Sequence, residues 1–101
     1  MKTFENRQTE IHYEGEQEKL KFSHLAGQLL TITPAGGKWH PNEMRLRFKI
    51  QDKLVAGVND ETIELEDAEL DKLHELSQDG FNFAHKDILA FADHLEELKK
   101  S

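Results

Sequence analysis

The chain has 101 residues, carries a formal net charge of −7 at pH 7 and contains no cysteine. This length suits a single domain, and the lack of thiols excludes disulfides, thiolate metal sites and cysteine-based catalysis. The longest apolar run, residues 54–58, is far below the ~20 residues of a membrane-spanning helix, and residues 1–7 carry no apolar signal segment. We therefore expect a soluble cytoplasmic protein that makes no membrane contact.

Charge is distributed unevenly along the chain. Residues 1–58 hold nine Lys/Arg and seven Asp/Glu, a balance of +2, whereas residues 59–101 hold four Lys and thirteen Asp/Glu, a balance of −9. Such an asymmetry can steer a charged partner toward one part of the molecule. The alternative interpretation is that the charge only keeps a small domain in solution.

The first third of the chain predicts three strands. Residues 1–8 read as a polar lead-in with Phe4 as their one apolar anchor. Residues 9–14 and 19–23 alternate between apolar and polar positions, and residues 15–17 between them predict a hairpin tip. Residues 27–33 are rich in β-branched side chains, which favours a third strand.

A loop and a central strand are predicted next. Residues 34–42 contain both prolines and two adjacent glycines, which indicates a loop, and Trp39 in it is either an exposed contact or a lid over the core edge. Every second position from 44 to 50 is apolar, and the positions between them are basic. Only a period of two keeps the two sets apart, so residues 43–51 predict a strand with one apolar and one basic face.

Two short strands and two helices follow. Residues 54–58 and 62–66 predict strands joined by a turn at Asn59 and Asp60. Asp67 is the predicted N-cap of a helix that runs to about Ser77. Asn82 is a candidate N-cap for a second helix, whose apolar stripe consists of Ile88, Phe91, Ala92, Leu95 and Leu98.

Strands that come first and helices that come last indicate the α+β class. We predict one domain over residues 1–101, with an antiparallel β-sheet of five to six strands across residues 9–66 and two C-terminal α-helices across residues 67–100. The helices are expected to pack on the apolar face of the sheet, which leaves the basic face open.

The open basic face suggests a function. We expect a small non-catalytic binding or regulatory protein that contacts single-stranded nucleic acid, because cations follow phosphates and aromatic rings stack on bases. The candidate contact residues are Lys19, Lys21, Trp39, Arg45, Arg47 and Lys49. The alternative interpretation is that these cations pair with carboxylates on neighbouring strands, which is ordinary sheet stabilisation.

The acidic C-terminal part suggests a second function. An acidic inhibitor or immunity-type protein docks on a basic protein partner through complementary charge. The candidate contact residues on the two predicted helices are Glu69, Asp71, Glu75, Asp87, Asp93, Glu96 and Glu97. A solvated helix face is the alternative interpretation of the same residues, and a homodimer joined edge to edge is a third hypothesis.

Catalysis and metal binding have little support in the sequence. Ser23 and His24 are adjacent, and neighbouring side chains of a strand point to opposite sides, so His24 could not act as a base for Ser23. His94 and Glu97 have the spacing of metal ligands on a helix, but the second pair that a di-metal bundle needs is missing. Residues 36–38 lack the spacing of a phosphate-binding loop. We therefore expect neither an enzyme nor a bound metal or cofactor.

Overall fold

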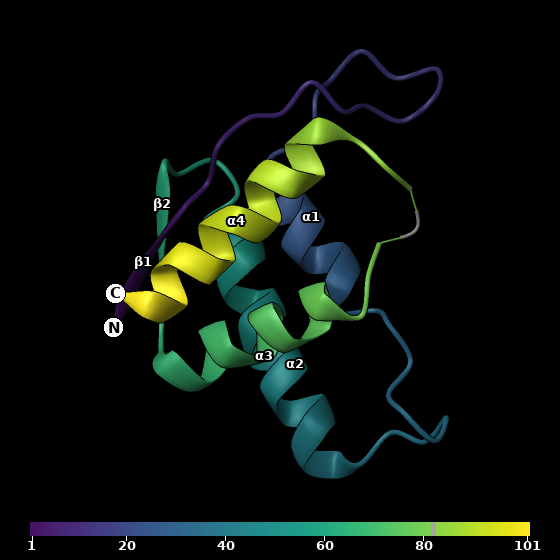
Figure 1. The fold of residues 1–101 in the computed structure, drawn as a ribbon, viewed down its shortest axis with the longest axis vertical. Helices are drawn as coiled ribbons and strands as arrows, with labels where there is room; N and C mark the ends of the chain where they lie inside the picture. Colours follow the sequence, from purple (N-terminus) through teal and green to yellow (C-terminus); the bar gives the residue numbers. More distant parts are fainter. Residues whose placement is uncertain (82) are drawn as a thin grey trace.

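In the residues that the structure describes, four helices and one two-stranded sheet form the fold (Figure 1). Across residues 1–81 and 83–101, which the computed structural model describes, the elements are β1 (Lys2–Glu5), α1 (Phe22–Leu29), α2 (Pro41–Ala56), β2 (Thr62–Leu65), α3 (Asp67–Gln78) and α4 (Lys86–Lys100). The two strands pair antiparallel. The prediction of a five- to six-stranded sheet is therefore wrong, and the α+β protein is mostly helical. Within the described residues, every helix is too short or too polar to cross a membrane.

The stretch predicted as the central strand lies inside α2. Pro41 occupies the start of this helix, where its missing N–H and fixed φ are favourable. Glu43 lies in the first turn and Lys53 in the last, as the helix dipole prefers. Most residues between them are Met, Arg, Leu, Lys and Gln, which are good helix formers. Local propensity therefore supports the helix, and the alternation from 44 to 50 is compatible with it by coincidence.

Burial along α2 follows the helical period. Arg47, Ile50 and Leu54 are buried, whereas Phe48 is 65% exposed. The predicted separation into an apolar inner face and a basic outer face is therefore wrong, because Arg47 faces the core and Phe48 faces the solvent.

Residues 22–23 and 27–30, predicted as parts of the strands 19–23 and 27–33, instead lie in α1 and in the turn after it. Phe22, Leu25, Ala26 and Leu29 are buried, at the spacing of one face of a helix. The predicted strand at residues 54–58 is likewise the last turn of α2 and the turn that follows it. Residues 22–29 carry this helical spacing, but the shorter alternating pattern of residues 19–23 favours a strand over the same stretch.

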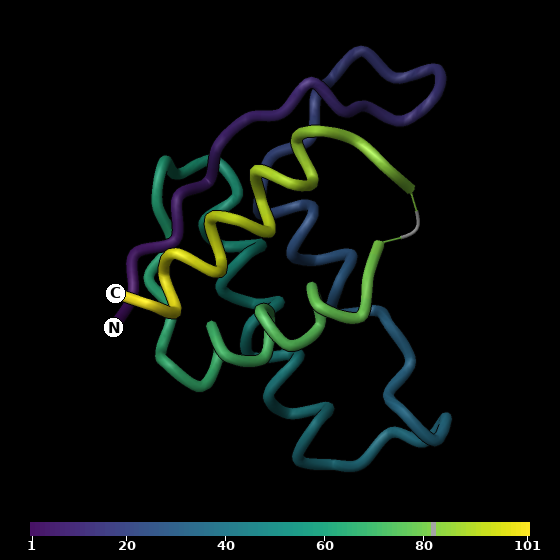
Figure 2. The backbone as a smooth tube through the Cα atoms, in the orientation of Figure 1, coloured from purple at the N-terminus to yellow at the C-terminus, as the bar shows by residue number. Residues whose placement is uncertain are grey.

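The predicted hairpin at residues 9–23 is found in part. The backbone N–H of Thr9 donates to the Leu20 carbonyl (2.8 Å), and the Leu20 N–H donates to the Ile11 carbonyl (2.7 Å). The chain reverses near Gly15, whose φ is +84°. The two arms do not continue as regular strands, and Figure 2 shows the segment as a loop that projects from the helices.

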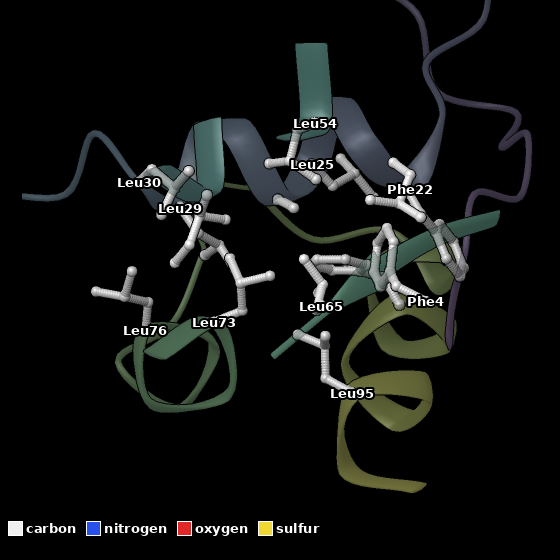
Figure 3. Packing of buried hydrophobic residues seen from close by; sticks show 14 of the residues in the cluster. Phe4, Phe22, Leu25, Leu29, Leu30, Leu54, Leu65, Leu73, Leu76 and Leu95 are labelled. Carbon is white, nitrogen blue, oxygen red and sulfur yellow. The ribbon is translucent and has the colours of Figure 1, made fainter. Parts of the chain in front are cut away.

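The N-terminal residues are a structural element and not a lead-in. β1 pairs with β2 so that Phe4 lies opposite Ile63. The Phe4 ring is fully buried, with its centroid 6.2 Å from that of Phe91 and 6.5 Å from that of Phe22. Figure 3 shows Phe4 and Phe22 in the core together with leucines from β2 and from the helices. β1 therefore joins β2, α1 and α4.

The buried side chain of Asn6, the residue after β1, makes hydrogen bonds to two other segments of the chain. Its Nδ2 donates to the carbonyls of Val58 and Asp60 (3.0 Å each), and its Oδ1 accepts from the backbone N–H of Ser23 (2.9 Å). These bonds tie β1 to the start of α1 and to the turn between α2 and β2. A buried amide with satisfied donors and acceptors specifies one arrangement of the chain.

The two C-terminal helices and the strand before them lie where they were predicted. α3 begins one residue earlier than expected, because Glu66 and not Asp67 is its N-cap. α4 is capped by His85, whose Nδ1 accepts from the backbone N–H of Asp87 (3.0 Å). Asn82, the predicted cap, lies outside the described residues.

We predict that Phe4→Ala lowers the free energy of unfolding by about 3–5 kcal/mol, because it leaves a cavity where three aromatic rings meet. The matched control is Phe48→Ala, which removes the same atoms from an exposed site and is expected to change stability by less than about 0.5 kcal/mol. Urea unfolding of both variants measures the difference. Equal losses would contradict the assigned role of β1.

Candidate functional site

Two of the predicted contact cations belong to the N-terminal segment and are already bonded. Lys19 Nζ forms an ion pair with Glu10 Oε2 (2.6 Å). Lys21 Nζ donates to the backbone carbonyl of Val58 (3.1 Å) and helps to hold the turn after α2. Their part in contacting a partner stays a prediction.

Two further cations lie on α2. Arg45 is exposed and donates to Asn42 Oδ1 (3.1 Å), so its charge is not neutralised by this bond. Lys49 Nζ forms an exposed ion pair with Glu66 Oε2 (3.1 Å). The hydrogen bond and the positive charge of Lys49 lower the pKa of Glu66 below its usual value. The cations predicted for one sheet face are therefore distributed over separate segments.

Arg47 has a structural position. It is 4% exposed, and its Nε donates to Glu43 Oε1 (2.8 Å) while its Nη1 donates to the carbonyls of Leu30 (3.1 Å) and Ile32 (2.5 Å). Its guanidinium lies 4.6 Å from the centroid of the Trp39 ring, a cation–π contact. Arg47 thus ties α2 to the end of α1 and to the loop that carries Trp39.

Glu43 extends this polar cluster to α3. Its second oxygen, Oε2, forms an ion pair with Lys72 Nζ (3.0 Å). Burial acts to raise the pKa of Glu43, but the hydrogen bonds and charges of Lys72 and Arg47 outweigh it, so the pKa lies below its usual value. The carboxylate is therefore charged at neutral pH and joins two helices.

The predicted acidic residues of α3 do not share one open face. Asp71 is exposed, but Glu69 is fully buried. Glu69 Oε1 accepts from Lys53 Nζ (2.6 Å) and from the backbone N–H of Glu66 (2.7 Å), which closes the first turn of the helix. Glu75 forms an ion pair with Lys72 (3.1 Å).

The acidic residues of α4 also differ in their surroundings. Asp93 and Glu97 are exposed, whereas Asp87 Oδ2 accepts from the backbone N–H of Glu10 (2.8 Å). Glu96 is paired with His74, and this hydrogen bond lowers the pKa of Glu96. Docking of a basic partner on these helices stays a prediction.

Ser23 and His24 are neighbours on α1 and not on a strand, so the reason given above for excluding them as a catalytic pair does not apply. His24 Nδ1 accepts from the backbone N–H of Lys21 (2.9 Å) and caps the helix. Ser23 Oγ is buried with no hydrogen-bond partner among the described residues. A serine activated by a base needs a hydrogen bond between the two, and the described residues contain none for Ser23 Oγ.

His94 is buried beside β1. Its Nε2 accepts from the backbone N–H of Glu5 (2.9 Å), and its ring centroid lies 5.6 Å from that of Phe4. Burial lowers the pKa of His94, because the charged form is poorly solvated there. Glu97, which has the spacing of a metal ligand relative to His94, is exposed, and the described part of the chain contains no group of three or more side chains that could hold a metal ion.

An apolar hollow of about 550 Å³ lies beside α1 and α2. A second hollow of about 270 Å³ adjoins it along the same helices and shares Gly27, Thr31 and Gln51 with it. Together we call them the α1–α2 groove. A Cβ at Gly27 would lie 3.4 Å from Gln51 Oε1, an ordinary contact distance, so Gly27 of α1 faces the side chain of Gln51 of α2 in the middle of the groove. The first hollow is lined by Gly27, Leu30, Thr31, Trp39, Met44, Arg47, Phe48 and Gln51.

One edge of α2 forms the rim of this groove. Met44, Phe48, Gln51 and Val55 recur at the spacing of one helix edge. Phe48 is 65% and Val55 is 62% exposed, and Trp39 at the end of the groove is 39% exposed. An exposed apolar patch with a helical repeat is typical of a surface that receives an amphipathic helix.

Of the residues predicted as contacts, the structure brings Trp39 and Arg47 together in the groove. Phe48 was missed, because the strand interpretation assigned it to the core. Reading α2 with a helical period would have found it. No protein-family model, curated protein or solved structure matches this chain.

We predict that the free energy of unfolding falls as the pH drops below 6.5. The pKa of His94 in the folded protein lies below the ordinary value of 6.5, so the unfolded chain binds the proton first and stability is complete only above that pH. His94→Gln keeps an acceptor for the Glu5 N–H and does not titrate, so its stability should change less between pH 6.5 and about 5. The exposed His12 provides the control His12→Gln, which should keep the wild-type slope. Denaturant unfolding at several pH values gives the comparison, and identical slopes for all three proteins would refute it.

We predict that Arg47→Ala lowers the free energy of unfolding by about 3 kcal/mol, because Glu43 and two carbonyls lose a buried donor. Arg45→Ala, on the same helix but exposed, should change it by less than about 0.5 kcal/mol. Urea unfolding at low protein concentration measures both free energies. A loss for Arg45→Ala as large as that for Arg47→Ala would contradict the structural role of Arg47.

Proposed function

We propose that this protein is a non-catalytic binding protein that contacts a protein partner through the α1–α2 groove. The observation that supports this proposal is the exposed ring of Phe48 at the rim of an apolar hollow of about 550 Å³. Single exposed apolar residues are common on protein surfaces, but here Phe48, Val55 and Trp39 border one continuous groove.

A protein partner fits the surroundings of the groove better than nucleic acid does. Lys19 and Lys49 are neutralised by carboxylates, and Arg47 is buried. The whole chain is acidic, with a net charge of −7, whereas nucleic-acid-binding domains are usually basic. The hollow that contains Phe48 is lined mainly by apolar surface, which favours a partner that buries apolar side chains.

The shape of the surface favours a helix as the bound segment. The edge residues from Met44 to Val55 extend over about 16 Å of α2, or about three helical turns. An amphipathic helix places apolar side chains at matching intervals along such an edge. As part of the same proposal, we assign the protein a regulatory or accessory role in the cytoplasm, which the absence of cysteine supports.

The matched variants Phe48→Glu and Leu89→Glu test this proposal. They introduce the same charge at side chains of nearly equal exposure, 65% and 67%, on different helices. We expect immobilised wild type and Leu89→Glu to retain the same proteins from a cell extract, and Phe48→Glu to lose some of them, because a charge is costly in an apolar contact. A retained protein, once purified, should change the emission of Trp39, the single tryptophan of the chain.

Three results would contradict the groove as the site of contact. The proposal fails if Phe48→Glu retains every protein that the wild type retains. Salt-sensitive quenching of Trp39 by oligo-dT would support the nucleic-acid hypothesis instead. Loss of binding only when the exposed Asp71 becomes Lys would support docking through α3.

A further inference from the structure

We propose that the helix bound along α2 is the α2 helix of a second copy of this chain, so that the protein forms a symmetric dimer through an antiparallel α2–α2 contact. This inference rests on the proposed function, because its contact surface shares Phe48 and Val55 with the rim of the groove and it names a second copy of the chain as the partner. It is carried by the exposed side chains of α2 and by the order of the charges among them.

Arg45, Phe48, Asp52 and Val55 are all exposed. Their intervals of three, four and three residues place them along one line of the helix. This alternating spacing is the one by which two helices pack along a common seam. The seam of α2 has an aromatic ring near its centre and opposite charges on either side of it.

Arg45 and Asp52 of one α2 helix face opposite charges on the α2 helix of a second copy only when the two helices run antiparallel. If a twofold axis passes between Phe48 and Lys49, Arg45 of each copy lies opposite Asp52 of the other, which gives two equivalent ion pairs. The two Phe48 rings then lie next to each other at the axis. A parallel pair would instead place Arg45 opposite Arg45 and Asp52 opposite Asp52, and like charges in a contact are unfavourable.

The position of α2 allows a second copy to approach. Figure 1 shows the N-terminal turns of α2 at one edge of the molecule, beyond α3 and away from the sheet. Within the part of the chain that the structure describes, Arg45 is held by a neutral partner, Asn42 Oδ1 (3.1 Å), so it can turn toward a carboxylate. Each chain has a net charge of −7, and salt screens charges that lie more than about 8 Å apart at physiological ionic strength. The acidic residues far from the contact therefore add little repulsion between the two copies.

Sedimentation of the full chain over a range of concentrations, at physiological ionic strength, tests the inference. The wild type should change from monomer to dimer as concentration rises. Phe48→Glu should raise the dimer Kd by about thirtyfold or more. Arg45→Asp and Asp52→Arg should each raise it by about tenfold, because each creates two like-charge contacts.

Charge reversal then tests the antiparallel register. The double variant Arg45→Asp/Asp52→Arg should dimerise as the wild type does, and an equimolar mixture of the two single variants should form a heterodimer that neither forms alone. Circular dichroism confirms that each variant keeps its helices. A wild type that stays monomeric up to about 1 mM, well above the Kd of specific dimers, overturns the inference. A double variant that does not recover, or a mixture that does not associate, also overturns it.

The two proposals fail in different ways. A monomeric wild type whose Phe48 still determines the capture of another protein refutes the dimer and leaves the groove as a binding site. If Phe48→Glu changes neither sedimentation nor capture, both proposals fail.

Discussion

The burial of Phe4 is the contact on which the rest of the structure depends. Two strands of four residues each are not stable alone in water, and β1 is held because its one inward ring packs against Phe22 of α1 and Phe91 of α4. The backbone of the next residue, Glu5, is bonded to His94, and Asn6 then reaches the turn after α2. The N-terminal residues thus join both ends of the chain and set the position of α1, which forms one wall of the groove.

Arg47 determines which side of α2 faces outward. Burying a guanidinium is costly unless its donors are satisfied, and here Glu43 and the carbonyls of Leu30 and Ile32 accept from it. Once Arg47 points inward, the helical period turns Phe48 to the solvent. The polar contact of one side chain and the exposure of its neighbour are therefore two results of the same helix rotation. This rotation also brings Arg47 against Trp39, and both side chains line the groove.

The distribution of charge is consistent with α2 as the contact surface under both proposals. Residues 1–58, which contain α2, have a balance of +2, whereas residues 59–101 have a balance of −9. Like charges on α3 and α4 disfavour contacts between those helices of two copies, whereas the seam of α2 carries one charge of each sign, Arg45 and Asp52. The acidic half of the chain would then act mainly against wrong contacts, and apolar burial along α2 would supply the attraction in the right one.

Local sequence determined the last strand and the two C-terminal helices, because residues 62–66 alternate regularly and the apolar residues of 70–76 and 88–98 recur with a helical period. The sheet prediction failed because residues 44–50 satisfy an alternating pattern and a helical one at once, and a short window does not separate them. Tertiary contacts select the helix, since two of the acceptors that let Arg47 be buried are the carbonyls of Leu30 and Ile32, 17 and 15 residues earlier in the chain. The candidate site followed the same rule: Trp39 was singled out from sequence, but the exposure of Phe48 depends on a helix rotation that long-range contacts impose.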